Sequence, residues 1–168
     1  MNADHEWDAA LAEAVLLREQ GKPEQARERL LALAEKHPDS VEVAYQTAWV
    51  HDVLGLEADA VPFYERALSA PGLTEEDRHG VFLGLGSTYR ILGRYEEALR
   101  TLRRGLAEFP DDAALQAFLA MALYNTGDGR EAVASLLRVL AATSADSRVQ
   151  QYRRAIEHYA GDLDAVEQ

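Results

Sequence analysis

The chain has 168 residues, of which 48% are hydrophobic and 27% charged, and its 17 Lys and Arg against 29 Asp and Glu give a formal net charge of −12. This composition is typical of one folded domain rather than a disordered chain, and so acidic a protein is a poor partner for nucleic acid. The sequence contains no cysteine, which excludes disulfides, thiolate zinc sites and cysteine nucleophiles.

The acidic N-terminal segment has no signal-peptide pattern, and no stretch of the chain approaches 18 uninterrupted apolar residues. We therefore expect a cytoplasmic protein that has no membrane partner.

Apolar residues recur at helical spacing along the chain, as in "LAEAVLL", "FLGLGSTYRIL" and "ALQAFLAMALY", and no segment alternates with the period of a strand. The segments "HPDS" and "FPDD" end one helix and begin the next, and Thr74, with Asp77 three residues later, is a predicted N-cap. We expect no sheet and nine helices, at residues 4–20, 23–37, 40–54, 57–70, 75–92, 95–109, 112–126, 129–142 and 146–160.

An internal repeat is marked by Gly21, Gly55, Gly93, Gly127 and Gly161, which are separated by 34, 38, 34 and 34 residues. Around each of the first four glycines, a small residue stands seven positions before, an alanine five after and a large apolar residue nine after. Small residues at fixed places let two helices approach closely, so the unit is predicted to be a helical hairpin with its glycine in the left-handed turn. The three sets are Ala14, Ala48, Gly86 and Ala120; Ala26, Ala60, Ala98 and Ala132; and Leu30, Tyr64, Leu102 and Leu136.

The third unit, "VFLGLGSTYRILGRYEEALRTLRRGLAEFPDD", resembles the 34-residue consensus of the tetratricopeptide repeat family. The segment from "GLTEEDRHGVFLGLGSTYR" through "FPDDAALQAFLAMALYNTG" is also similar to a small bacterial subfamily of unassigned function. The consensus positions that are present are Gly86, Tyr89, Gly93, Tyr95, Ala98 and Pro110.

The resemblance implies an all-α, right-handed solenoid of helical hairpins that forms a single domain over residues 1–168. It has four repeats plus a C-terminal capping helix whose apolar stripe would cover the last repeat. The expected repeats lie at about 7–40, 41–74, 79–112 and 113–146, the capping helix at 146–160 and a tail at 161–168. The expected stripe consists of Val149, Tyr152, Ile156 and Tyr159.

No enzymatic pattern stands out in the sequence. "GLGST" at 84–88 lacks the third glycine, the preceding strand and the lysine of a phosphate-binding turn. The five histidines form no metal-binding pair at helical spacing, and His51 is predicted to be a partly buried structural residue. No serine or threonine has a base at a motif spacing. We therefore expect no catalytic residue, no cofactor and no metal.

In the tetratricopeptide family the first helices of successive units line a concave groove, which the resemblance transfers to this chain. The lysine, asparagine and arginine clamp of the chaperone-binding members is not reproduced, so an acidic C-terminal peptide is not predicted. The groove is instead expected to be apolar and aromatic. Its residues are Leu11, Val15, Arg18, Tyr45, Trp49, Asp52, Leu83, Ser87, Arg90, Ala117, Met121 and Tyr124.

These positions predict a non-enzymatic protein-binding module. A polypeptide would be held by Tyr45, Trp49, Met121 and Tyr124, while Arg90 orients a carboxylate or carbonyl. Three alternatives remain at this stage. The aromatic residues could pack inside the helix stack, the protein could form a homodimer or larger oligomer through the groove or an array end, and an unrecognised enzyme is a distant third.

Overall fold

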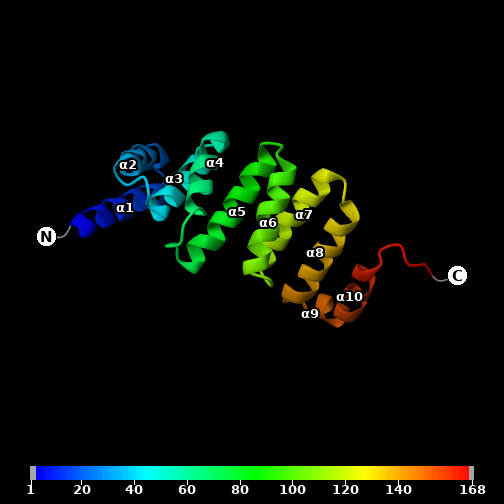
Figure 1. Cartoon of the computed structure of the whole chain (residues 1–168). Helices are drawn as coiled ribbons and strands as arrows, with labels where there is room; N and C mark the ends of the chain where they lie inside the picture. The colour runs from blue at the N-terminus through cyan, green and yellow to red at the C-terminus, as the bar shows by residue number, and fades with distance from the viewer. Residues whose placement is uncertain (1–2, 167–168) are drawn as a thin grey trace. The chain divides into compact units, whose positions relative to one another are not determined.

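The computed structural model describes residues 3–166, with side chains from Trp7 onward. Within that range all helices are α-helices and there is no strand, so the predicted all-α class is confirmed (Figure 1). The last two residues of the predicted tail lie outside the described range. The chain divides into two compact units, residues 1–92 and 93–168. The first contains α1 (Ala3–Glu19), α2 (Pro23–Lys36), α3 (Val41–Val53), α4 (Glu57–Ala67) and α5 (Glu75–Ile91), and the second contains α6 (Tyr95–Glu108), α7 (Ala113–Thr126), α8 (Gly129–Thr143), α9 (Ser147–Gln151) and α10 (Arg153–Gly161).

The turns that follow the first helices are made by the repeat glycines. Gly21, Gly55, Gly93 and Gly127 have φ angles of 73°, 69°, 74° and 93°, which confirms the left-handed turns predicted from their spacing. Gly161 differs because it is the last residue of α10 and is not among the glycines with positive φ. The repeat boundaries and the single domain expected from the resemblance stay predictions.

Side-chain caps fix the starts of α3, α5 and α7, and Asp146 caps α9. The Thr74 hydroxyl accepts a hydrogen bond from the Asp77 backbone N–H at 3.0 Å and donates to its carboxylate at 2.9 Å, so the predicted cap of α5 is confirmed. Ser40 accepts from the N–H of Val43 at the start of α3. Asp112 caps α7 in the same way. The segments "HPDS" and "FPDD" therefore begin helices as predicted.

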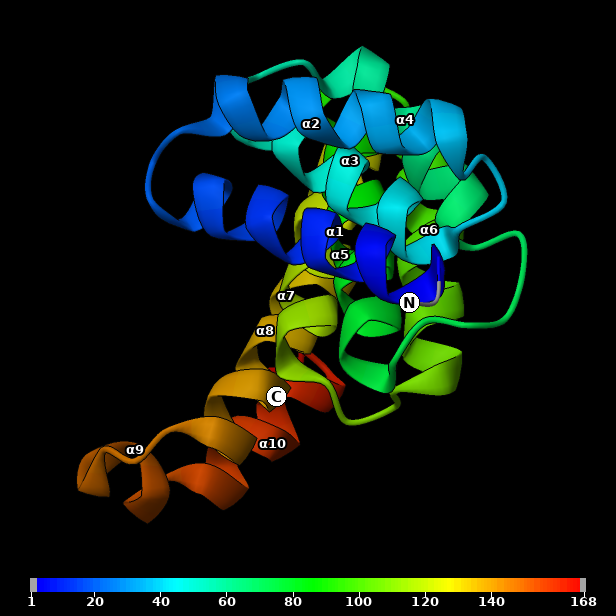
Figure 2. The ribbon, with the colours of Figure 1, turned by 90° about the vertical axis from the view of Figure 1, so that its left-hand side faces the viewer.

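In the first unit, α1 packs on α2 and α3 packs on α4, and α5 contacts both α3 and α4. Figure 2 shows the α1–α2 and α3–α4 pairs from the N-terminal side. The small repeat residues Ala14 and Ala26 are fully buried, and they cluster with Leu30 of α2 and Val50 of α3. The small and large positions of the predicted hairpins thus form the interior of this unit.

Two glycines let α5 approach the tyrosines of the preceding hairpin. A Cβ atom at Gly80 would lie within 3.0 Å of the Tyr45 Oη, and one at Gly84 would lie within 3.0 Å of the Tyr64 Oη. Real Cβ atoms almost never come so close to another heavy atom. The absence of a side chain at both positions is therefore needed for this packing, and Gly84 of "GLGST" has a structural role.

In the second unit, α6 packs on α7, α7 on α8, and α10 on α8, while α9 contacts both α8 and α10. The interior contains Ala98 and Leu102 of α6, Ala120 and Leu123 of α7, and Ala132 of α8, all at most 4% exposed. These include repeat positions, so the hairpin periodicity also holds here.

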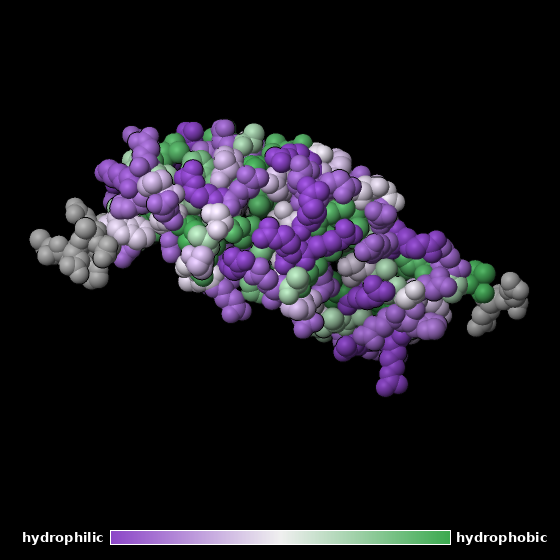
Figure 3. Space-filling model, viewed as in Figure 1, coloured by the Kyte–Doolittle hydropathy of each residue, from purple (hydrophilic) through white to green (hydrophobic). Residues whose placement is uncertain are grey.

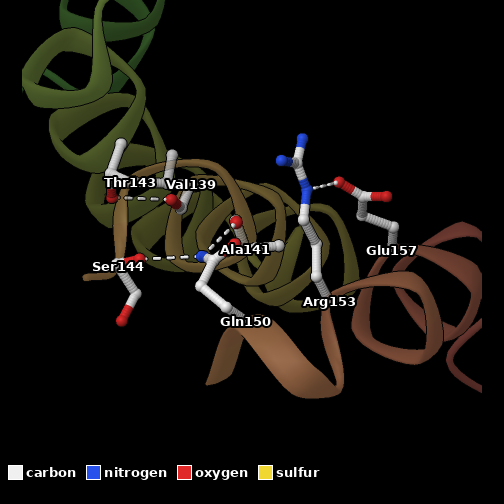
Figure 4. Close-up of polar contacts among 7 residues, drawn as sticks. All are labelled: Val139, Ala141, Thr143, Ser144, Gln150, Arg153 and Glu157. Carbon is white, nitrogen blue, oxygen red and sulfur yellow. Dashed lines mark hydrogen bonds and ion pairs between the residues drawn. The ribbon is translucent and has the colours of Figure 1, made fainter. Parts of the chain in front are cut away.

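The predicted ninth helix is wrong in its length, because it is broken at Tyr152 into α9 and α10. Tyr152 has φ and ψ angles of −100° and 7°, which depart from α-helical values and separate the two helices. Gln150 of α9 donates to the carbonyls of Ala141 and Ser144 at the end of α8 (Figure 4). Arg138 of α8 donates instead to the Ala160 carbonyl near the end of α10. Each half is thus attached to a different part of α8.

The C-terminal helices cover α8 less completely than the sequence predicts. Leu136 occupies the repeat position at which Leu30, Tyr64 and Leu102 are at most 2% exposed, yet it is 44% exposed. Tyr152 and Tyr159 of the predicted capping stripe are also exposed. Val149 and Ile156 of the stripe are half-buried and α10 packs on α8, so a C-terminal cap is present, but two residues of the expected stripe do not take part in it.

Candidate functional site

A hollow of about 530 Å³ lies on the first unit, and the residues that line it belong to α1, α3 and α5 only. Since these are the helices that precede a repeat glycine, the hollow is lined by first helices alone. This size falls in the range of protein pockets that hold ligands or side chains of a partner. We call it the first-unit hollow; its lining residues are Asp8, Leu11, Ala12, Val15, Leu16, Glu19, Glu42, Gln46 and Asp77.

The apolar part of the hollow comes from α1. Leu11 and Val15 are half-buried and Leu16 is 51% exposed, so the three side chains form a strip that reaches the surface. Leu11 also packs against the buried clusters of the α1–α2 hairpin, which fixes the strip on the core. The predicted groove residues Leu11 and Val15 thus lie in one depression.

Four carboxylates surround the apolar strip. Glu42 accepts a hydrogen bond from the Ser40 hydroxyl at 2.8 Å, and Asp77 accepts one from Thr74. None of the four carboxylates, which belong to Asp8, Glu19, Glu42 and Asp77, forms an ion pair with another residue in the described part of the chain. Among the described residues that line the hollow there is no Lys or Arg. The rim is therefore negatively charged and uncompensated by direct pairing.

An aromatic and cationic cluster borders the hollow through Gln46. Arg18 donates to the Gln46 side chain at 2.5 Å, and its guanidinium carbon lies 3.6 Å from the ring centroid of Trp49. Tyr45 stacks on Trp49 with centroids 5.7 Å apart. Trp49 is 40% exposed, whereas Tyr45 and Arg18 are buried. Of the two aromatic residues of α3 that were expected to contact a partner, only Trp49 presents part of its ring to the surface.

Burial changes the titration of this cluster. It raises the pKa of the Tyr45 phenol to about 12, and the neighbouring Asp77 carboxylate adds to the rise. Burial also lowers the pKa of the Arg18 guanidinium, although the tyrosines and Glu19 oppose that effect. Tyr45 is therefore a neutral packing partner of Trp49 at physiological pH.

Asp52, predicted as a groove residue, is held by hydroxyl groups from α4 and α5. Tyr64 donates to its carboxylate at 2.7 Å, and the Thr88 hydroxyl lies 3.0 Å from both carboxylate oxygens. Burial raises the pKa of the Asp52 carboxyl, and these hydrogen bonds offset only part of the rise. The residue joins three helices of the first unit, so its role in the structure is to hold them together.

The remaining predicted positions lie on α5 and α7. Leu83, Ser87 and Arg90 of α5 are half-buried, and the Arg90 Nε is buried with no hydrogen-bond partner among the described residues. On α7 of the second unit, Met121 is 38% and Tyr124 is 74% exposed. Ala117 is half-buried.

His51 is a structural residue, as predicted, although it is fully rather than partly buried. Its Nδ1 lies 2.7 Å from the Thr47 carbonyl, and its Nε2 accepts a hydrogen bond from the Arg27 Nε at 3.1 Å. The ring also stacks on Phe63. Because an arginine can only donate, Nε2 is the acceptor of this hydrogen bond. In the described part of the chain, no three acidic or histidine side chains are grouped to hold a metal ion.

The acidic rim was not predicted, although helical spacing contains a signal for it. Glu19 lies four residues after Val15, and Asp8 lies three before Leu11, so both continue the face that the groove positions define. On the face drawn in Figure 3, hydrophilic residues cover most of the surface and hydrophobic residues show between them in smaller groups. An apolar depression with an acidic rim is more informative than isolated apolar side chains on such a surface.

Hairpins joined by left-handed glycines, with a hollow lined by their first helices, define an α-helical repeat protein. The chain belongs to the tetratricopeptide repeat family: the family model described as "Tetratrico peptide repeat" matches residues 40–163, and a second, "Tetratricopeptide repeat", matches residues 8–40. The predicted family and fold class are confirmed, and proteins of this fold are protein-interaction modules. In the part of the chain that the structure describes, no helix has both the length and the apolar character to cross a membrane.

Known proteins with similar sequence or structure agree with this assignment. Superkiller protein 3 of Schizosaccharomyces pombe (strain 972 / ATCC 24843) is 33% identical over 106 residues, which cover 61% of this chain but only 8% of that protein. A crystal structure of MamA protein has a TM-score of 0.67 at 15% identity and covers 96% of this chain and 78% of its own. The crystal structure of YrrB, described as a TPR protein with an unusual peptide-binding site, has a TM-score of 0.65 at 20% identity, with coverage of 92% and 84%. At these identities the two structures establish the fold alone.

Proposed function

We propose that this protein is a non-enzymatic module that binds a polypeptide segment on the first helices of its repeats. The observation that carries the proposal is the first-unit hollow, whose lining comes from α1, α3 and α5 and from no second helix. A depression shared by several helices can contact successive residues of one bound segment. The similarity to YrrB, which is described as having a peptide-binding site, supports the same kind of ligand.

Trp49 is the proposed aromatic anchor beside the hollow. Its exposed fraction of 40% leaves ring surface for a partner, and its contacts with Tyr45 and Arg18 restrain the ring in one orientation. A restrained aromatic side chain loses little entropy on binding, which is why such residues dominate many interfaces. In this proposal Tyr45 supports the anchor and does not touch the partner. Met121 and Tyr124 supply exposed apolar contacts on the second unit.

Site-specific photo-crosslinking tests the location of the binding surface. A photoreactive amino acid replaces Leu16 in the hollow or, as a control, the exposed Glu28 of α2. We expect a partner from native cell extract to be crosslinked through the first position and not through the second. Equal adducts at both positions would contradict the proposal.

Affinity measurements with the captured partner test the anchor. Trp49→Ala is expected to weaken binding by about 2 kcal/mol, which is roughly thirtyfold. Wild-type affinity in the double variant Trp49→Ala, Tyr124→Ala, with an unchanged circular dichroism spectrum, would show that the partner binds elsewhere.

A second candidate function is self-association through α8. Val133, Leu136 and Leu140 are 43–48% exposed and follow one another at helical spacing, so they form a continuous apolar stripe. Residues 129–166 carry 5 Arg against 5 Asp and Glu, whereas residues 1–92 carry 8 Lys and Arg against 17 Asp and Glu. Contact between two copies of the stripe is therefore not opposed by net charge.

Light scattering over a concentration series tests this second function. If two copies pair through α8, the wild-type mass rises with concentration, and Leu136→Glu keeps the protein monomeric because it places a charge in the apolar stripe. A wild-type chain that stays monomeric throughout the series excludes a stable homodimer through this surface.

A further inference from the structure

We propose that the first-unit hollow selects a cationic amphipathic segment, in which one or two large apolar side chains are flanked by Lys or Arg. The apolar side chains would contact Leu11, Val15 and Leu16, and the cations would meet the carboxylates of the rim. This inference rests on the proposed function, since it names the chemistry of the segment bound in the same hollow.

The negative charge of the rim favours a cationic ligand. Asp8 and Glu19 stand at the two ends of the lining stretch of α1, while Glu42 and Asp77 come from α3 and α5. Carboxylates on three helices therefore surround one depression, and none is neutralised by an ion pair within the described residues. An approaching cation gains from all of them, and an acidic segment would be repelled by all of them.

Arg18 does not cancel this field by occupying the hollow. It is 9% exposed, donates to Gln46 and lies over the Trp49 ring at the border, so its single positive charge, which interacts with Glu19, stands against four carboxylates on the rim. The unit as a whole adds to the negative potential, because residues 1–92 contain 17 Asp and Glu but only 8 Lys and Arg. The rim of the hollow and the rest of the first unit thus both favour a positively charged ligand.

The apolar strip favours an amphipathic segment over one that is only basic. Leu16 is half exposed, and Leu11 and Val15 lie beside it in the depression. Covering this strip removes apolar surface from water, which free Lys side chains alone would do poorly. A polyanion such as nucleic acid would face the carboxylates with its phosphates and is excluded on the same grounds.

Binding of designed peptides tests the selection directly. Four fluorescein-labelled peptides with the cores KKLLKK, EELLEE, KKSSKK and SSLLSS, each flanked by two glycines, are titrated with the full chain and followed by fluorescence anisotropy at 50 and 300 mM salt. We expect the first peptide to bind most tightly and to lose affinity at high salt, because exposed charge pairs are screened. The second and third are expected to bind at least tenfold more weakly.

Matched variants assign the effect to the rim. Glu19→Gln with Asp77→Asn should weaken KKLLKK about fivefold, as expected for two surface charge pairs, and should reduce its salt dependence. The control, Glu28→Gln with Glu35→Gln, removes the same charge from exposed positions on α2 and should leave the affinity unchanged within twofold. Leu16→Ser should weaken KKLLKK and SSLLSS alike.

The outcomes distinguish a failure of the cationic selection from a failure of the proposed peptide binding. If SSLLSS binds as tightly as KKLLKK and Leu16→Ser weakens both, the hollow binds peptides but does not select cations. If the α2 control variant loses as much affinity for KKLLKK as the rim variant, the effect depends on the net charge of the protein alone, and the inference is overturned. If no peptide binds, both the cationic selection and peptide binding in this hollow are rejected.

Discussion

Replacing Gly80 with alanine should destabilise the first unit, although alanine is the better helix former. A Cβ atom at this position of α5 would approach the Tyr45 Oη within 3.0 Å and its Cζ at 3.0 Å. Tyr45 cannot simply move away, because its side chain is 6% exposed and its ring stacks on Trp49. The added methyl group must therefore displace either the buried ring or the helix.

The size of the effect follows from two opposing contributions. Gly→Ala inside a helix stabilises by about 1 kcal/mol, whereas overpacking a buried contact costs about 1–3 kcal/mol. We expect a net loss of about 1–2 kcal/mol in the free energy of unfolding for Gly80→Ala. In a Tyr45→Phe background the oxygen that lies closest is absent, so the same substitution should become neutral or stabilising.

The contact between Gly84 of the same helix and Tyr64 provides the control. At Gly84 the added Cβ would meet the Tyr64 Cζ at 2.6 Å and its Cε1 at 2.9 Å in addition to the oxygen. Removing the hydroxyl with Tyr64→Phe leaves those ring atoms in place, so it should not rescue Gly84→Ala.

Urea unfolding followed by tryptophan fluorescence measures both cycles, because both tryptophans of the chain, Trp7 and Trp49, lie in the first unit. A gain in stability for Gly80→Ala in the wild-type background, or the same loss with and without Tyr45→Phe, would refute the close approach of α5 to α3.

Asp52→Asn should change the pH dependence of unfolding. Burial raises the folded-state pKa of Asp52, so the wild type should gain stability relative to this variant as the pH falls through that pKa. A stability difference that does not change with pH would contradict this prediction. Ala98→Leu should lower the free energy of unfolding by about 1–3 kcal/mol because the alanine is fully buried, and an unchanged melting curve would argue against this packing. Deleting residues 146–168 uncovers part of α8 and should cause aggregation or a broader transition; a soluble truncated chain that melts as sharply as the full one would oppose a capping role.

Local chain chemistry explains why most of the fold could be predicted. The turn glycines and the Thr74 cap depend on backbone conformation and on neighbours within a few residues, so their spacing in the sequence locates the helices. The break at Tyr152 has no such local signal, and the hydrogen bonds that attach α9 and α10 to α8 are tertiary contacts that the sequence pattern does not contain. Leu136 has the same repeat spacing as the buried Leu30, Tyr64 and Leu102, and its exposure depends on how much of α8 the C-terminal helices cover.

The candidate site was less predictable because neighbouring side chains decide which residues reach the surface. Tyr45 and Trp49 stand four residues apart on α3 and have the same helical signal, yet only Trp49 is partly exposed. The difference arises because Tyr45 packs beneath α5 at Gly80, and that approach depends on the tertiary structure. Nothing in the repeat pattern singles out Gly80 as a contact position.

The Arg27–His51 hydrogen bond makes the order of the repeats matter. It joins α2 of one hairpin to α3 of the next, at a place where the imidazole is otherwise surrounded by protein. A hairpin carrying His51 that followed any neighbour without a donor at this point would bury an unsatisfied nitrogen, at a cost of about 1–3 kcal/mol. Duplicating or exchanging these hairpins, which the shared helical geometry would otherwise permit, is thus disfavoured by a single polar contact. The two hairpins have become a matched pair and are no longer interchangeable copies.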